Sequence, residues 1–230
     1  MKTELINYFG NDEMVVNVAR VSYGKEASNY TIEQNNKLIN YLIKHGHTSP
    51  LRHPQLQFRI KVPIYVERQL RKHEVGIEVQ PIECSINSIS GRYVDFSDSY
   101  TQIKQWRKQS KSSKQGSEGL VDNQDKCTEI EYKVIEYCKN AYLELLELGV
   151  CKEQSRTLLP LALNTEYIWT GSLLAFIHLS NLRLKPDAQQ ETREVVNTML
   201  YIVENIEGNP FKYCLEAFNL KHDPECLLVN

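Results

Sequence analysis

Residues 55–62 read Gln-Leu-Gln-Phe-Arg-Ile-Lys-Val, so polar and apolar side chains alternate without exception. Successive side chains of a β-strand point to opposite faces of the sheet. The segment is therefore predicted to be a strand with its apolar side chains in the core and its polar side chains on the other face. Pro63 follows, and because proline suits the first turn of a helix, we expect a helix over residues 64–73.

Helical periodicity dominates most of the remaining chain. Apolar residues at spacings of three and four predict helices over 11–23, 31–46, 129–149, 165–184 and 188–206, after an opening strand over 3–9. The segment 165–184 is apolar almost all round, which favours a helix inside the core or at an oligomer interface. We expect one α/β domain over 1–230 whose C-terminal half is mostly helical.

Composition narrows the possible partners. The 230 residues are 41% hydrophobic and 24% charged, as in a soluble globular protein, and the formal charge of −2 predicts no general affinity for nucleic acid or anionic membranes. No apolar run approaches the roughly 18 residues of a membrane span. The six cysteines form no C-x-x-C pair and the N-terminus lacks a signal peptide, so a cytoplasmic protein with free thiols is expected.

A polar passage near 101–126 interrupts the helical pattern. Its first half, 101–114, holds five basic residues and no acidic ones, with many serines and glutamines. Such a composition is typical of a surface loop. We interpret the passage as a polar surface insertion.

Two charged motifs have ordinary explanations. Residues 45–53, His-Gly-His-Thr-Ser-Pro-Leu-Arg-His, contain three histidines, but without a later Cys or His cluster they do not define a zinc site, and no metal is predicted. Residues 68–74, Arg-Gln-Leu-Arg-Lys-His-Glu, form a charge run typical of a solvated helix face. Gln69, Lys72 and His73 are expected on one face of that helix.

Residues 84–93, Cys-Ser-Ile-Asn-Ser-Ile-Ser-Gly-Arg-Tyr, gather small hydrogen-bonding side chains beside one arginine. Small residues let backbone N–H groups approach an anion, and Arg92 can bind a phosphate in bidentate fashion. An anion cradle and a serine-rich turn explain this pattern about equally well. Arg156 and Arg183 lie in apolar helical surroundings, where either an anionic ligand or an internal salt bridge would account for them.

Taken in order, these segments resemble the flavin-dependent thymidylate synthases. Members of that family carry an H-G-H-x-[ST]-P-x-x-H loop, an alternating strand, a helix containing glutamine and a stretch like R-H-R-x-x-S-x-N-x-x-S-x-R-Y. Matching segments lie at 45–53, 58–69, 85–93, 142–173 and 181–195, and the resemblance spans about residues 3–218. No Pro-Cys dipeptide is present, although the folate-only thymidylate synthases hold their nucleophile in that context.

The resemblance implies an α+β fold, a mixed α/β single domain with an antiparallel sheet, which assembles as a homotetramer with active sites shared between subunits. The implied reaction is the reductive methylation of dUMP to dTMP. Methylenetetrahydrofolate would donate the carbon, and NADPH would supply reducing power through bound FAD.

The resemblance also implies roles for particular residues. Those matching the dUMP-binding positions are Gln69, Lys72, Ser88, Ile89, Ser90, Gly91, Arg92, Arg156 and Arg183, and those matching the FAD-binding positions are His47, Ser49, Lys72, His73, Asn87, Ser172 and His178. Arg183 takes the place of the arginine thought to stabilise negative charge at uracil N3, so it is the implied catalytic residue. Ser90 is assigned to binding, because an unassisted serine hydroxyl is a poor nucleophile.

The sequence departs from the family pattern mainly at the flavin positions. Lys72-His73-Glu74 replaces R-H-R, and residues 75–84 include an insertion of about eight residues relative to the family pattern. These departures fit a divergent branch, with a viral source as one interpretation. Two alternatives stay open: a sister enzyme that hydroxymethylates or methylates a pyrimidine nucleotide differently, and a nucleotide-binding homologue that has lost catalysis.

Overall fold

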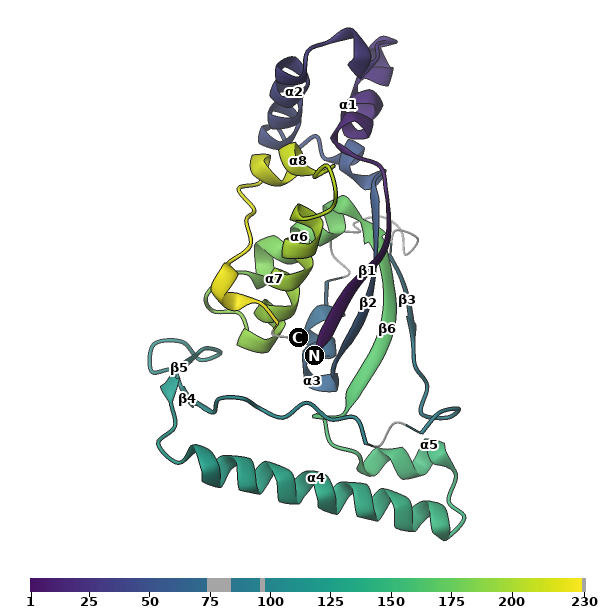
Figure 1. The fold of residues 1–230 in the computed structure, drawn as a ribbon, viewed down its shortest axis with the longest axis vertical. Helices are drawn as coiled ribbons and strands as arrows, with labels where there is room; N and C mark the ends of the chain where they lie inside the picture. The colour runs from purple at the N-terminus through teal and green to yellow at the C-terminus, as the bar shows by residue number, and fades with distance from the viewer. Residues whose placement is uncertain (74–83, 96–97, 229–230) are drawn as a thin grey trace.

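The computed structural model describes residues 1–73, 84–95 and 98–228 (Figure 1). Its centre is a four-stranded sheet in the order β1-β2-β6-β3, and every neighbouring pair is antiparallel. The strands are β1 (Lys2–Phe9), β2 (Gln55–Pro63), β6 (Asn164–Ser172) and β3 (Cys84–Ser88). The strands predicted at 3–9 and 55–62 are confirmed.

The alternation predicted for β2 is seen in the structure: its apolar side chains lie on the core face of the sheet and its polar side chains on the other face. Leu56, Phe58, Ile60 and Val62 are all buried, and the ring of Phe58 meets that of Phe176 edge-on at 5.2 Å. On the opposite face, the amide of Gln57 donates a hydrogen bond of 2.9 Å to the hydroxyl of a threonine on β6. One face of the sheet therefore forms the core and the other presents hydrogen-bonding groups.

Three helices pack around the core face of the sheet. They are α3 (Ile64–Leu70), α6 (Leu173–Arg183) and α7 (Gln190–Glu204). Figure 1 shows α6 and α7 side by side along the sheet, with α3 at the end of β2. The central residues Val195 and Val196 of α7 are almost completely buried.

The helices α1 (Asp12–Arg20), α2 (Ile32–Lys44) and α8 (Lys212–Ala217) lie together at one end of the molecule (Figure 1). The side chain of Asn11 accepts the N–H of Met14, and Thr31 and Gln34 form the predicted capping box of α2. The short 3₁₀ turns are Val21–Tyr23, Ala27–Asn29, Ser49–Arg52, Arg156–Leu158 and Pro224–Cys226.

The opposite end of the molecule is formed by the long helix α4 (Gln124–Glu147) and the short helix α5 (Lys152–Ser155). Figure 1 shows the extended chain after residue 98 running between the sheet and α4 and ending in the hairpin of β4 (Arg107–Gln109) and β5 (Ser117–Leu120). In the part of the chain that the structure describes, no helix has the length and apolar character needed to cross a membrane.

The predicted helix over 165–184 is wrong in its first half, which is strand β6. Tyr167 and Trp169 are buried on the core face, while the alternate residues Ile168 and Thr170 are half-buried. Aromatic and β-branched residues in such alternation favour a strand. The helix begins only after Ser172, whose hydroxyl accepts the N–H of Ala175 as an N-cap. The strand and the buried helix are both apolar and follow each other without a turn, so their combined sequence has the composition of one long apolar helix.

The predicted helix over 64–73 is shorter than expected, because α3 ends at Leu70 and a turn follows. Lys72 and His73 therefore lie beyond the helix. The altered residue Glu74 and the insertion 75–83 fall outside the described residues, and Cys84 begins β3.

Candidate active site

A cleft of about 780 Å³, here called the Arg183 cleft, opens between α3, the end of α6, the start of α7 and the β4–β5 hairpin. Arg183 is the last residue of α6, and Gln69 is the penultimate residue of α3. His73 lies in the chain just after α3. All three predicted site residues line this cleft, although Arg183 is 110 or more positions away from the other two in the sequence.

Two hydrogen bonds hold the guanidinium of Arg183. Its Nε donates to Nε2 of His73 at 2.5 Å, and its Nη2 donates to the backbone oxygen of Gln69 at 3.3 Å. Burial, and after it the positive charge of Arg183, lowers the pKa of His73 from 6.5 to about 4. The imidazole is therefore neutral at physiological pH and can accept the proton of Nε. Burial also lowers the pKa of Arg183, but arginine remains charged at neutral pH.

A second cleft of about 440 Å³, here called the Arg156 cleft, lies on another side of α3. Ser88, Ile89, Gly91 and Arg156 line it, so four of the predicted dUMP residues come together there. Arg156 is exposed at the junction of α5 and the following 3₁₀ turn. The structure thus divides six of the nine predicted dUMP residues between two clefts, and Lys72, Ser90 and Arg92 are among the lining residues of neither.

The 84–93 stretch forms strand β3 followed by a tight turn. The backbone N–H groups of Tyr93 and Val94 both donate to the carbonyl oxygen of Ser90, and the N–H of Arg92 lies 3.3 Å from the Ser90 hydroxyl. The guanidinium of Arg92 is exposed and lies over the ring of Tyr93 at 5.3 Å. Gly91 is buried within this turn.

Sequence reasoning missed two arginines of the Arg156 cleft, because the charge run 68–74 was interpreted as a solvated face. Arg68 and Arg71 both line this cleft, and Arg71 pairs with Glu67 at 2.7 Å and reaches the hydroxyl of Ser88 at 3.4 Å. Residues three or four apart share one face of a helix, so Arg68 and Arg71 share a face that differs from the face of Gln69 and His73. This spacing was the signal that could have indicated a second set of ligand-facing residues. Lys72 is exposed and is among the lining residues of neither cleft.

The hairpin of the predicted surface insertion forms part of the Arg183 cleft. Gln109, Gln115 and Ser117 line it across from Arg183, together with Arg107. The passage is on the surface as predicted, but its side chains face one of the candidate clefts. Composition alone gave no signal for this, because polar uncharged residues suit both a loop and a ligand-facing wall.

The residues assigned to FAD are spread over the fold and are not gathered at one site. His47 and Ser49 are exposed in the loop before β2, and Ser172 pairs with the first residue of β2, whereas His73 follows α3 at the other end. The nine residues of β2 place its two ends roughly 26 Å apart. Asn87 is exposed on β3, and His178 is exposed on α6.

These side chains fit a flavin cofactor in part. The histidines 47 and 178, Ser49 and Asn87 are exposed and free to hydrogen-bond a ligand. Ser172 is fully buried, and its hydroxyl already caps α6, so it has little capacity for a ligand contact. Among the described residues, no group of three or more His, Cys, Asp or Glu side chains could hold a metal ion.

Comparison of the sequence with known proteins identifies the family to which the chain belongs. The family model described as thymidylate synthase complementing protein matches residues 4–207. A flavin-dependent thymidylate synthase of Thermus thermophilus is 37% identical over 200 residues, which is 87% of this chain and 70% of that protein. One of Kosmotoga olearia is 39% identical over 193 residues, covering 83% of this chain and 79% of that protein. The chain belongs to the flavin-dependent thymidylate synthase family.

A solved structure shares the fold. The crystal structure of the UMP/dUMP methylase PolB from Streptomyces cacaoi, bound with 5-Br dUMP, aligns with a TM-score of 0.80. The two chains are 24% identical, and the alignment covers 95% of this chain and 94% of the other. This likeness confirms the predicted mixed α/β fold class.

Proposed function

We propose that this protein is a flavin-dependent thymidylate synthase that methylates dUMP to dTMP. Methylenetetrahydrofolate donates the carbon, and NADPH provides the electrons. The names of the relatives support this reaction class. The observation that carries the proposal is Arg183, which is held by His73 and Gln69 in a cleft large enough for a nucleotide base and a second substrate.

In this proposal, Arg183 acts on the uracil ring. With Nε held by His73 and one N–H of Nη2 by the carbonyl oxygen of Gln69, the other N–H groups of the guanidinium are assigned to stabilising the negative charge that develops at N3. A donor already fixed in place stabilises developing charge with little reorganisation. The side chain of Gln69 lines the same cleft and is assigned to hydrogen-bonding of the base.

The Arg156 cleft is assigned to the phosphate and sugar. Arg68, Arg71 and Arg156 line it beside the serine and glycine of the 88–91 stretch. Guanidinium groups recognise phosphate through paired, charge-assisted hydrogen bonds, and small residues allow close backbone approach. These features support the anion-cradle interpretation for residues 88–91, whereas Arg92, the arginine of that interpretation, lies over Tyr93 and lines neither cleft.

We also propose that the protein is a homotetramer in which one subunit completes the site of another. The division of the predicted dUMP residues between two clefts supports a shared site. Exposed apolar side chains of α4 support burial in an assembly, since Ile130, Val134 and Tyr137 are 52, 50 and 78% exposed.

The free thiols of residues such as Cys127 and Cys138 are consistent with the expected reducing cytoplasm.

FAD, when bound, would supply the route by which electrons from NADPH reach the transferred carbon. His47, Ser49, Asn87 and His178 are the accessible side chains that would hold it. His73 contributes from the Arg183 cleft, where its neutral ring is positioned by the contact with Arg183.

Incubation of the purified protein with dUMP, methylenetetrahydrofolate and NADPH, followed by mass analysis of the nucleotide, tests the proposal. We expect dTMP. A hydroxymethylated nucleotide would identify the sister reaction, and a parallel incubation with UMP would reveal a ribonucleotide preference. A colourless protein that leaves both nucleotides unchanged would identify the homologue without catalysis.

A further inference from the structure

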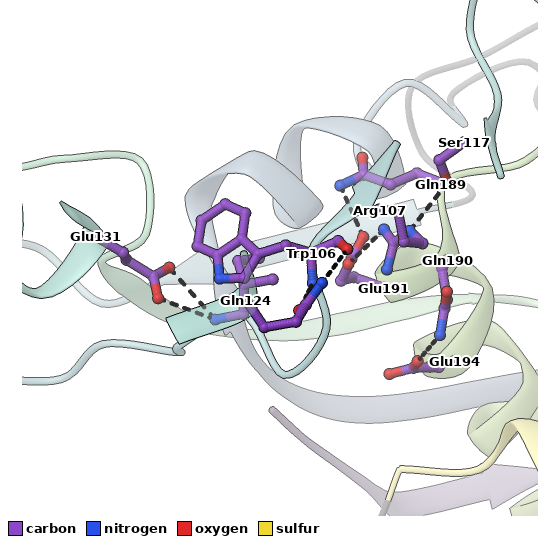
Figure 2. A network of polar contacts seen from close by, with 10 residues as sticks. Trp106, Arg107, Ser117, Gln124, Glu131, Gln189, Gln190, Glu191 and Glu194 are labelled. Carbon is purple, nitrogen blue, oxygen red and sulfur yellow. Dashed lines mark hydrogen bonds and ion pairs between the residues drawn. The ribbon is translucent and has the colours of Figure 1, made fainter. Parts of the chain in front are cut away.

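The β4–β5 hairpin is fixed to α7 by a nearly buried ion pair (Figure 2). Nη2 of Arg107 lies 2.7 Å from Oε1 of Glu191, and the two side chains are only 20 and 11% exposed. The amide of Gln189 donates to the other carboxylate oxygen at 3.2 Å. Nε of Arg107 donates to the hydroxyl of Ser117 at 2.9 Å, so one guanidinium joins both strands of the hairpin to α7.

The chain leading into the hairpin is fixed from the other side by α4. The backbone N–H of Trp106 donates to the side chain of Gln124 at 2.8 Å, and the amide of Gln124 donates back to the carbonyl of Trp106 at 2.8 Å. The indole N–H of Trp106 reaches the hydroxyl of Thr128 at 3.1 Å. Figure 2 shows Gln124 and Glu191 on either side of this chain, so both helices set the position of the hairpin.

The hairpin held in this way faces the proposed catalytic arginine. Gln115 lines the Arg183 cleft from the hairpin, while Lys185 and Arg193 line it from the connection to α7 and from α7 itself. Gln109 lines it too, but its side-chain Nε2 lies within hydrogen-bond distance of three backbone carbonyls of the hairpin and so holds the hairpin together. The cleft therefore combines the amide of Gln115 with an excess of positive charge, because Arg183, Lys185 and Arg193 face only two lining carboxylates, Glu118 and Asp187. This chemistry suits a ligand that carries both amide and carboxylate groups.

We propose that the β4–β5 hairpin is the wall of the Arg183 cleft that binds the glutamyl tail of the folate co-substrate, and that Arg107 is a positioning residue that holds this wall through Glu191. The inference rests on the proposed function. The carbon donor must approach the uracil ring, so it shares the cleft that holds Arg183. Its tail then extends along the cleft past Gln115 of the hairpin, with its carboxylates near Lys185 and Arg193.

The variant Arg107→Met removes the ion pair and keeps much of the side-chain length. We expect the KM for methylenetetrahydrofolate to rise about tenfold, with kcat and the KM values for dUMP and NADPH within about twofold of wild type, because only the wall is displaced. Lys108→Met is the matched control: it removes the exposed pair with Asp122 in the same hairpin, which does not reach α7. We expect this control to behave as wild type.

Charge exchange keeps the test informative if Arg107→Met folds poorly. Arg107→Glu and Glu191→Arg should each raise the KM for the folate, and the double variant should recover most of the loss. An unchanged folate KM in Arg107→Met, a change in the NADPH KM instead, or no recovery in the double variant would each overturn the proposal.

Hydrogen exchange of residues 107–120 separates this proposal from the proposed function. We expect 5-formyltetrahydrofolate, a stable folate, to slow exchange in the hairpin of the wild type and of Lys108→Met, but not in Arg107→Met. Slowed exchange in a wild type that does not methylate dUMP would support the folate wall and refute the reaction. Normal methylation without any effect of the folate on the hairpin would refute the folate wall alone.

Discussion

The pairing of Arg183 with a histidine has a chemical consequence that a carboxylate partner would not have. A carboxylate would orient the guanidinium but would also neutralise its charge. The imidazole of His73, whose pKa is lowered to about 4, accepts one N–H and adds no negative charge. The arginine is thus oriented while its full positive charge remains available to a ligand, which suits stabilisation of an anion on a ring.

Replacement of Arg183 should therefore affect turnover far more than folding. For Arg183→Ala we expect kcat for dTMP formation to fall by about 10²–10³-fold, as for loss of a fixed electrostatic donor. The free energy of unfolding should change by less than about 1 kcal/mol, because the side chain lies at a helix end beside a cleft. Arg183→Lys, which keeps a charge without the planar fork, should recover only part of the activity. Wild-type turnover in Arg183→Ala would show that the assigned role is wrong.

The burial of His73, together with its contact with Arg183, also predicts a pH dependence of stability. The pKa of His73 is about 4 in the folded protein and near 6.5 in the unfolded chain, so the unfolded state binds more protons between these values. Stability should fall as the pH is lowered from 6.5 to 4 and should be unaffected by this group above that window. Urea unfolding of His73→Gln, which has no titrating ring, should show a weaker loss over the same window. Parallel pH profiles would contradict the assignment.

The helices and strands that were predicted best from the sequence are those whose characteristic pattern lies within one short segment. The alternation in β2 and the capping box of α2 each lie within one segment, so both were correctly predicted. The 165–184 segment failed because its strand is the third in the sheet, flanked by β2 and β3, and its helix is buried, so both halves are apolar. Only the position of Ser172 marks the boundary, and a single serine is a weak signal without the pairing to β2.

The capping box of α2 offers a test of local stability away from the clefts. Thr31 and Gln34 exchange side-chain and backbone hydrogen bonds at the first turn. Thr31→Ala should lower the free energy of unfolding by about 1 kcal/mol. Ser28→Ala removes an exposed hydroxyl with one long contact of 3.4 Å and serves as the control, with no measurable change expected. Thermal unfolding compares the two, and equal melting temperatures would refute the stabilising role of the cap.

The way the fold brings distant segments together explains why the candidate site could be predicted only in part from the sequence. Arg183 stands in a recognisable motif and does line a cleft, whereas Arg92 stands in one and lines neither. Arg68 and Arg107 were missed, because their importance depends on which surfaces the fold brings together. In the folded chain, α3 presents Gln69 to one cleft and Arg68 to another, so a single helix takes part in both.

A site divided in this way predicts complementation between subunits. Arg156→Ala removes a side chain of one cleft and Arg183→Ala removes one of the other, so each variant alone should have little activity. If the Arg156 cleft of one subunit meets the Arg183 cleft of its neighbour, co-expression of the two variants produces some sites that contain both arginines. We expect the mixed preparation to regain a measurable part of the wild-type rate of dTMP formation, with no gain when either variant is mixed with itself. Absence of any recovery, in an assembly shown by mass to contain both variants, would mean that each subunit binds dUMP with its own residues alone.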